Sequence, residues 1–131
     1  MDYIIDTQNA MPIYEQLRNQ VIYNIAISKL NKGDSLPSVR RLADDLEINF
    51  HTVNKAYALL SNEGYIVMDR RKGAVVADIQ ADGKLLPKDM SDRLDLIAAE
   101  AICRGMDYMN FVSHCMQSFR RAKGEQNAPS Q

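Results

Sequence analysis

Residues 36–60 read LPSVRRLADDLEINFHTVNKAYALL and contain two short helical patterns separated by a break. Ser38 is a favourable N-cap, and the apolar residues after it recur at the spacing of one helix face: Val39, Leu42, Ala43 and Leu46. After a break at residues 47–49, Asn49 can cap a further helix with its own apolar stripe: Val53, Ala56, Tyr57 and Leu60. Two short helices joined by a tight turn predict a helix-turn-helix.

The flanking segments extend this pair. Residues 12–30 place Ile13, Leu17, Val21 and Ile25 four apart, which predicts a helix that ends near the turn-forming residues NKGD at 31–34. Residues 65–78, YIVMDRRKGAVVAD, predict a β-hairpin with strands over 65–68 and 74–77 around a charged turn. Three helices followed by a hairpin are the layout of a winged helix-turn-helix, which we assign to residues 1–78.

The rest of the chain predicts a linker and two further helices. Residues 79–88 are polar and contain Gly83 and Pro87, as a linker would. Residues 89–122 hold one helix that Gly105 terminates and a second that Asp107 caps. We expect residues 123–131 to be a disordered tail. The predicted fold is therefore mainly α with a small β-hairpin.

The last helix carries apolar side chains on more than one face, and such a helix needs two packing partners. We therefore expect a homodimer in which the two-helix region packs against its symmetry mate. The alternative is that this region folds back on the N-terminal domain. The residues expected at the dimer contact are Leu94, Ile97, Ala101, Tyr108, Phe111, Val112, Cys115, Met116 and Phe119.

Composition narrows the class of protein. The 131 residues are 46% hydrophobic and 25% charged with a formal net charge of −1, as in a globular rather than a disordered chain. No apolar run is long enough for a membrane span and no cleavable leader is visible, so we expect a cytoplasmic protein. Cys103 and Cys115 lack metal-site spacing, so we expect reduced, partly buried thiols and no metal or cofactor, with a redox switch as the alternative.

Two arginines stand where a helix start disfavours them. Arg40 and Arg41 fall in the first turn after Ser38, at the positive end of the helix dipole, where carboxylates are preferred. A bound polyanion would make this placement favourable, whereas solvated surface charge is the plainer alternative. The carboxylates Asp44, Asp45 and Glu47 come later and can face away from such a ligand.

The next helix and the hairpin strengthen the case for nucleic acid. His51, Thr52, Asn54 and Lys55 lie opposite the buried stripe, and these residue types bind base edges and phosphates in the major groove. The hairpin turn adds Arg70, Arg71 and Lys72 just before Gly73. Three cations at a tight turn suit a phosphate backbone or a minor groove.

These segments together resemble the GntR family of bacterial transcription regulators. The runs PIYEQLRNQV, GDSLPSVRRLADDL, HTVNKAYALLSNEGYI and RRKGAVV follow the family's order and spacing over about residues 11–77. The short two-helix tail further resembles the YtrA-type subfamily, whose members are compact dimers. The resemblance implies DNA contacts at Ser38, Arg40, His51, Thr52, Asn54 and Gly73, and the charge pattern adds Arg41, Lys55, Arg71 and Lys72.

The chain departs from the family's usual residues at the start of the predicted recognition helix. Glu47, Phe50 and His51 replace a glycine, a proline and an asparagine that are common in the subfamily, and Arg71 replaces a usual glycine. Phe50 fixes the helix start less than proline would, but it offers an apolar contact for a thymine methyl group. His51 alters which bases are read.

We therefore predict a sequence-specific transcriptional regulator, a repressor, that binds a palindromic operator in double-stranded DNA as a homodimer. The rival is a winged helix that serves only as a protein-interaction module. An enzyme is disfavoured because no nucleophile with a base, phosphate loop or metal set is visible. A small-molecule effector stays unknown.

Overall fold

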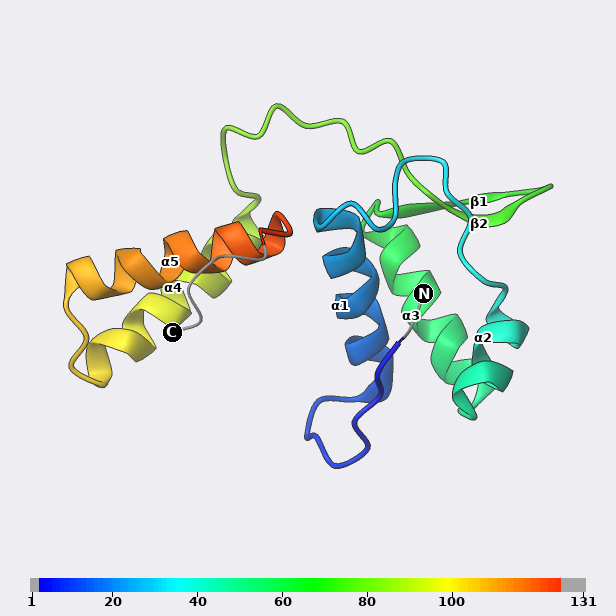
Figure 1. Ribbon diagram of the computed structural model, residues 1–131, viewed down its shortest axis with the longest axis horizontal. Coiled ribbons are helices and arrows are strands. Elements are labelled where there is room, and N and C mark those ends of the chain that lie inside the picture. Colours follow the sequence, from blue (N-terminus) through cyan, green and yellow to red (C-terminus); the bar gives the residue numbers. More distant parts are fainter. Residues whose placement is uncertain (1–2, 126–131) are drawn as a thin grey trace. The chain divides into compact units, whose positions relative to one another are not determined.

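The computed structural model describes residues 3–125, and its secondary structure follows the predicted order (Figure 1). Three helices come first: α1 (Ile13–Ala26), α2 (Val39–Leu46) and α3 (Phe50–Asn62). A two-stranded antiparallel hairpin follows, formed by β1 (Ile66–Asp69) and β2 (Gly73–Val76). Helices α4 (Lys88–Cys103) and α5 (Tyr108–Ala122) complete the described chain. The chain divides into two compact units, residues 1–79 and residues 80–131.

Side-chain caps fix where three of the helices begin. Ser38 Oγ accepts a hydrogen bond from the Arg41 backbone N–H, and Asn49 Oδ1 accepts one from His51. Asp107 Oδ1 accepts from Asn110 at the start of α5. Each cap satisfies an N–H group that has no partner within its helix, so these starts follow from local sequence. The three predicted caps are confirmed.

The core of the first unit lies where α1, α2 and the hairpin meet α3. Leu17, Val21, Val53, Leu60 and Ile66 are all at most 1% exposed. The predicted α3 stripe is buried throughout, whereas α2 buries Leu42 and Ala43 and leaves its outer apolar residues partly covered. Helix α3 packs against α1, α2 and β1 through its buried face, so its opposite, exposed face remains available to a ligand.

Helix α1 ends earlier than the sequence predicts. The pattern extends it to residue 30, but the helix stops at Ala26 and Ser28 takes a positive φ of 67°. The N–H groups of Lys29 and Leu30 both donate to the Asn24 carbonyl, which turns the chain. Leu30, only 5% exposed, then enters the core instead of continuing the helix.

An N-terminal arm packs along α1 through two glutamines. The Gln16 side chain accepts from the Asp6 N–H and donates to the Asp6 carbonyl, and Gln20 does the same with Ile4. The two glutamines therefore pair with the backbone N–H and carbonyl groups of Ile4 and Asp6, as a neighbouring β-strand would. The arm buries Tyr3, which is 8% exposed.

The hairpin register brings Asp69 opposite Gly73, so the strands are shifted by one residue from the predicted ranges. Gly73, expected within the turn, is the first residue of β2 and has a φ of 76°, a conformation that glycine adopts without strain. The turn itself is therefore Arg70, Arg71 and Lys72.

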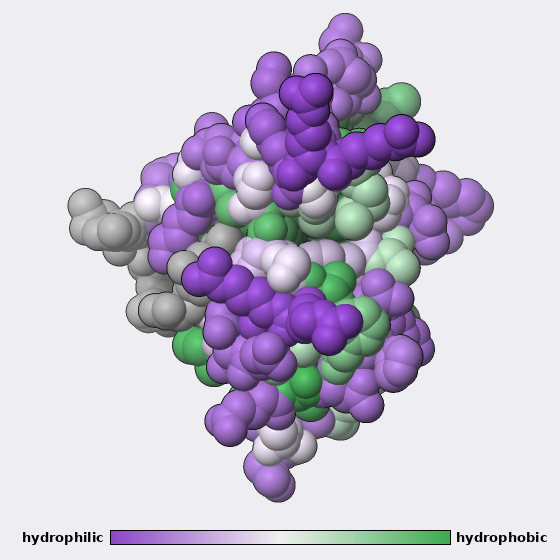
Figure 2. All heavy atoms as spheres, turned by 90° about the vertical axis from the view of Figure 1, so that its right-hand side faces the viewer, coloured by the Kyte–Doolittle hydropathy of each residue, from purple (hydrophilic) through white to green (hydrophobic). Residues whose placement is uncertain are grey.

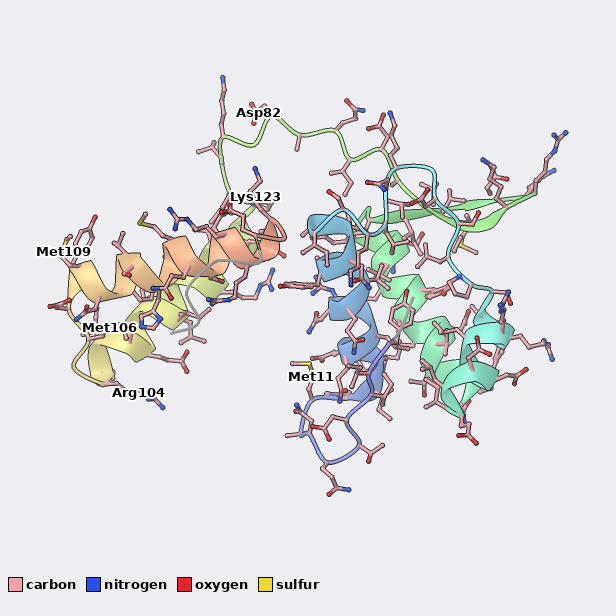
Figure 3. All side chains as sticks on the ribbon, viewed as in Figure 1. Met11, Asp82, Arg104, Met106, Met109 and Lys123 are labelled. Atoms are coloured by element: carbon pink, nitrogen blue, oxygen red, sulfur yellow. The ribbon has the colours of Figure 1, made fainter. Side chains whose placement is uncertain are left out.

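The second unit is a hairpin of α4 and α5, and Figure 3 shows Arg104, Met106 and Met109 at the end where the two helices connect. No residue of either helix is buried within the described chain. Cys103 and Cys115 are free and exposed, so the expectation of partly buried thiols is wrong for this single chain. None of the described helices combines the length and apolar character that a membrane span requires.

Candidate nucleic-acid interface

The first turn of α2 contains no acidic residue and presents two arginines with different partners. Arg41 reaches along its own helix, with its Nε 3.8 Å from Asp45 Oδ2. The expectation that Asp45 faces away is therefore wrong, because a residue four positions on lies on the same side of a helix. Arg40 instead reaches toward α3, with its guanidinium carbon 5.6 Å from the centre of the Phe50 ring.

Ser38 keeps one hydrogen-bonding function unused by the fold. Its oxygen accepts from Arg41 at 3.1 Å, which leaves the exposed hydroxyl hydrogen available as a donor. A phosphate oxygen at the start of α2 would receive that hydrogen, together with the charges of the two arginines.

The first turns of α3 present polar side chains on its exposed face. Phe50, His51, Asn54 and Lys55 are exposed, and Thr52 is half-buried. The His51 and Phe50 rings form a T-shaped pair, with 84° between their planes and 5.6 Å between their centres. Within the described chain Asn54 has no side-chain hydrogen bond, so its amide is available for a bidentate contact with a base.

Lys55 has a partner that sequence reasoning missed. Its Nζ lies 4.1 Å from the centre of the Tyr14 ring on α1, which is a cation–π contact. Tyr14 therefore orients a cation of the candidate interface. The local signal was weak, because Tyr14 sits beside the apolar stripe of α1 and looks like an ordinary core residue.

A buried tyrosine in the middle of α3 fixes the helix to a neighbouring segment. The Tyr57 hydroxyl donates to the Pro37 carbonyl at 2.7 Å, which joins α3 to the connector before α2. Burial raises the pKa of Tyr57, so the phenol stays protonated and remains a donor at any ordinary pH. This bond fixes the position of α3 relative to the connector that leads into α2.

The same connector is joined to the wing, the hairpin of β1 and β2. Ser35 forms an isolated antiparallel bridge with Val75, and the Leu36 N–H donates to the Ala74 carbonyl at 2.8 Å. The wing and the start of α2 are therefore linked through backbone hydrogen bonds. Seen from the side that carries α2 and the wing, the surface is mainly hydrophilic around a less polar hollow (Figure 2).

The wing tip concentrates positive charge on a turn shaped by one carboxylate. Asp69 Oδ1 accepts from the backbone N–H groups of Arg71 at 2.7 Å and Lys72 at 3.0 Å. These two hydrogen bonds, with the nearby Lys72 charge, lower the pKa of Asp69. The side chains of Arg70, Arg71 and Lys72 form no salt bridge with any described residue, so their charges are available to an external anion.

The residues predicted for the dimer contact lie on the second unit, partly around an apolar groove between α4 and α5. Ile97 is 53% and Phe119 68% exposed. The groove has a volume of about 630 Å³, and the predicted residues that line it are Leu94, Ile97, Phe111, Cys115 and Phe119. Tyr108 and Met116 are exposed outside it, whereas Ala101 and Val112 are partly covered.

In the described part of the chain, no three histidine, cysteine or acidic side chains group as metal ligands. His51 belongs to α3 and His114 to α5.

Comparison with known proteins identifies the family of this chain. The chain matches the family described as bacterial regulatory proteins, gntR family, over residues 11–76, which is half of its length. The HTH-type transcriptional repressor YtrA of Bacillus subtilis is 39% identical over 74 residues, covering 56% of this chain and 57% of that protein. A match to the B. subtilis regulator YhcF covers 59% of that protein, so the chain spans little more than half the length of these relatives.

Solved structures of two regulators share the fold. YtrA from Sulfolobus acidocaldarius, a GntR-family transcription factor, is 37% identical with a TM-score of 0.62, over 77% of this chain and 97% of that one. A GntR family regulator from Listeria monocytogenes is 26% identical with a TM-score of 0.65, over 84% and 97%. The chain therefore belongs to the gntR family of bacterial regulatory proteins.

Proposed function

We propose that this protein is a cytoplasmic DNA-binding transcriptional regulator that represses transcription from a palindromic operator. One observation carries the proposal: α2, α3 and the wing are joined by hydrogen bonds through the connector before α2. These three elements carry the unpaired wing cations and the exposed polar groups at the starts of α2 and α3. In this arrangement α3 enters the major groove and the wing meets the adjacent backbone or minor groove.

The overall charge does not oppose this function. The formal net charge is −1, but six of the sixteen lysines and arginines belong to the candidate interface. Arg40 and Arg41 lie at the start of α2, Lys55 on the exposed face of α3, and Arg70, Arg71 and Lys72 in the wing turn. Arg41 is shared with Asp45, yet both side chains are more than 60% exposed, so water screens the pair and a phosphate can compete for the arginine. A locally positive surface is sufficient to attract DNA.

A homodimer is the proposed binding form. The groove between α4 and α5 is still open, and large apolar side chains of both helices, among them Ile97 and Phe119, are exposed in the single chain. A second copy would cover these groups and would match the two-fold symmetry of a palindromic site. No effector is assigned to the groove.

The rival function, a winged helix used only for protein contacts, requires an apolar exposed face on α3. Phe50 is the exposed large apolar residue there, at 41%, and the face continues with His51, Asn54 and Lys55. Polar donors of this kind favour DNA over an apolar partner. The family relationship likewise favours a regulator over an enzyme.

Selection of bound sites from random duplex DNA tests the proposal. The wild type should enrich one palindromic sequence, Arg40→Ala should weaken binding to it by about 1–3 kcal/mol, and His51→Asn should change the preferred bases. Arg104→Ala, which removes the same charge from the second unit, is the control and should bind like the wild type. Failure of the wild type to enrich any sequence at low salt would favour the protein-interaction module.

A further inference from the structure

The Phe50 ring is a meeting point for two of the candidate DNA-contacting side chains. Phe50 is the first residue of α3. The centre of its ring lies 5.6 Å from the Arg40 guanidinium carbon and 5.6 Å from the centre of the His51 ring. Arg40 belongs to α2 and His51 to α3. A single aromatic side chain therefore couples the starts of both helices.

Arg40 has an alternative partner that it does not take. Asp44 lies one helical turn further along α2 and lines the same hollow of about 200 Å³ as Arg40 and Phe50. Arg40 nevertheless forms no salt bridge with Asp44 or with any other described residue, whereas its neighbour Arg41 does lie near Asp45. The aromatic ring thus directs Arg40 away from its own helix and toward α3.

This arrangement leaves the arginine ready to bind. A guanidinium held by a cation–π contact has no carboxylate to give up, so a base or phosphate can accept its N–H donors. An arginine paired with Asp44 would have to give up charged hydrogen bonds before it could bind DNA. Holding the side chain in place also reduces the conformational entropy lost on binding.

We propose that Phe50 is a positioning residue, which acts on DNA through Arg40 rather than by touching a base itself. The inference rests on the proposed function. It differs from a thymine-methyl contact, in which Phe50 would contribute to binding whether or not Arg40 is present. It also gives a role to a residue at which this chain departs from the resemblance described above.

A double-mutant cycle on the full chain separates the two roles. The cycle measures affinity for the duplex selected by the wild type, with Phe50→Leu, Arg40→Ala and the double variant. Phe50→Leu should weaken binding about two- to fivefold, the range expected of an exposed cation–π contact. In the Arg40→Ala background the same change should have no further effect, because coupling is confined to residues that interact.

Base preference provides a readout that a purely structural role would not move. Phe50→Leu should relax the preference at the same base pair that Arg40→Ala relaxes, whereas Phe50→Tyr keeps the ring and should retain both affinity and preference. An unchanged melting temperature of Phe50→Leu shows that its fold is intact. If the melting temperature is lower, the cycle is repeated with Phe50→Tyr and Phe50→Met.

Each outcome decides between the inference and the function beneath it. Equal losses from Phe50→Leu in both backgrounds would establish direct base contact and overturn the positioning role. No loss in either background would also overturn the positioning role. In both cases wild-type binding and its weakening by Arg40→Ala leave the proposed function standing. A wild type that selects no sequence removes the proposed function and the inference together.

Discussion

At the scale of single residues, two buried tyrosines of the first unit differ in one hydrogen bond. Tyr57 is 4% exposed and donates to Pro37, whereas Tyr3 is 8% exposed and its hydroxyl has no partner within the described chain. A buried polar group contributes to stability only when it is hydrogen-bonded. The same substitution at the two positions should therefore have different effects.

Tyr57→Phe should lower the free energy of unfolding by about 1 kcal/mol, because it removes the bond to the Pro37 carbonyl. Tyr3→Phe should leave the free energy unchanged or raise it, because it removes an unsatisfied hydroxyl. Thermal unfolding of the two variants is the measurement, and a shift of about 4–8 °C per kcal/mol is expected for a domain of this size. Equal shifts would contradict the assignment of the bond.

At the scale of elements, the sequence predicts where helices begin better than where they end. The caps at Ser38, Asn49 and Asp107 depend on groups two or three residues away, so local pattern was enough. The end of α1 was missed because Leu30 extends the apolar pattern, although it folds back into the core.

Long-range side-chain choices were not predictable. Gln16 and Gln20 read as surface residues of a helix, but they bind backbone groups 10 and 16 residues away. Phe50 could be placed at the start of α3, yet nothing local chose it over Asp44 as the partner of Arg40. Such choices depend on which segments meet in the folded chain, which no short motif encodes.

The wing yields a prediction about how its turn is shaped. Asp69→Asn and Asp69→Ala remove the same charge, but only asparagine keeps an oxygen for the N–H groups of Arg71 and Lys72. Asp69→Ala should therefore bind DNA a few-fold more weakly than Asp69→Asn, because the wing cations lose a fixed turn. Anisotropy titrations near pH 7 would measure the difference. Equal affinities would mean that Asp69 acts through charge alone.

The pH of that comparison follows from the Asp69 carboxyl. Its pKa is lowered in the folded chain, so ionised Asp69 contributes fully to the turn above its unfolded pKa of about 3.9. The contribution is lost as the pH falls through the lower folded value. Neutral conditions therefore keep the wild-type turn intact.

At the scale of the whole molecule, the proposed dimer contact lies on the exposed apolar side chains of the second unit. Phe119→Glu places a carboxylate at the apolar groove and should convert the proposed dimer into monomers, as measured by sedimentation equilibrium. Operator affinity should fall at least tenfold, because each half-site is then bound separately. Asn110→Glu, on a polar part of α5, is the control and should remain dimeric. A dimeric Phe119→Glu variant would place the interface elsewhere.

The central claim is that the wild type reads DNA sequence through the surface made by α2, α3 and the wing. The most direct measurement compares its affinity for the selected duplex with that for a scrambled duplex of equal length, by fluorescence anisotropy at about 0.1 M salt. The account predicts an affinity at least about 10³-fold higher for the selected duplex. It also predicts a slope of log affinity against log salt near −5 to −7, for roughly three to four phosphate contacts per subunit. Equal affinity for both duplexes, or affinity independent of salt, would contradict the account.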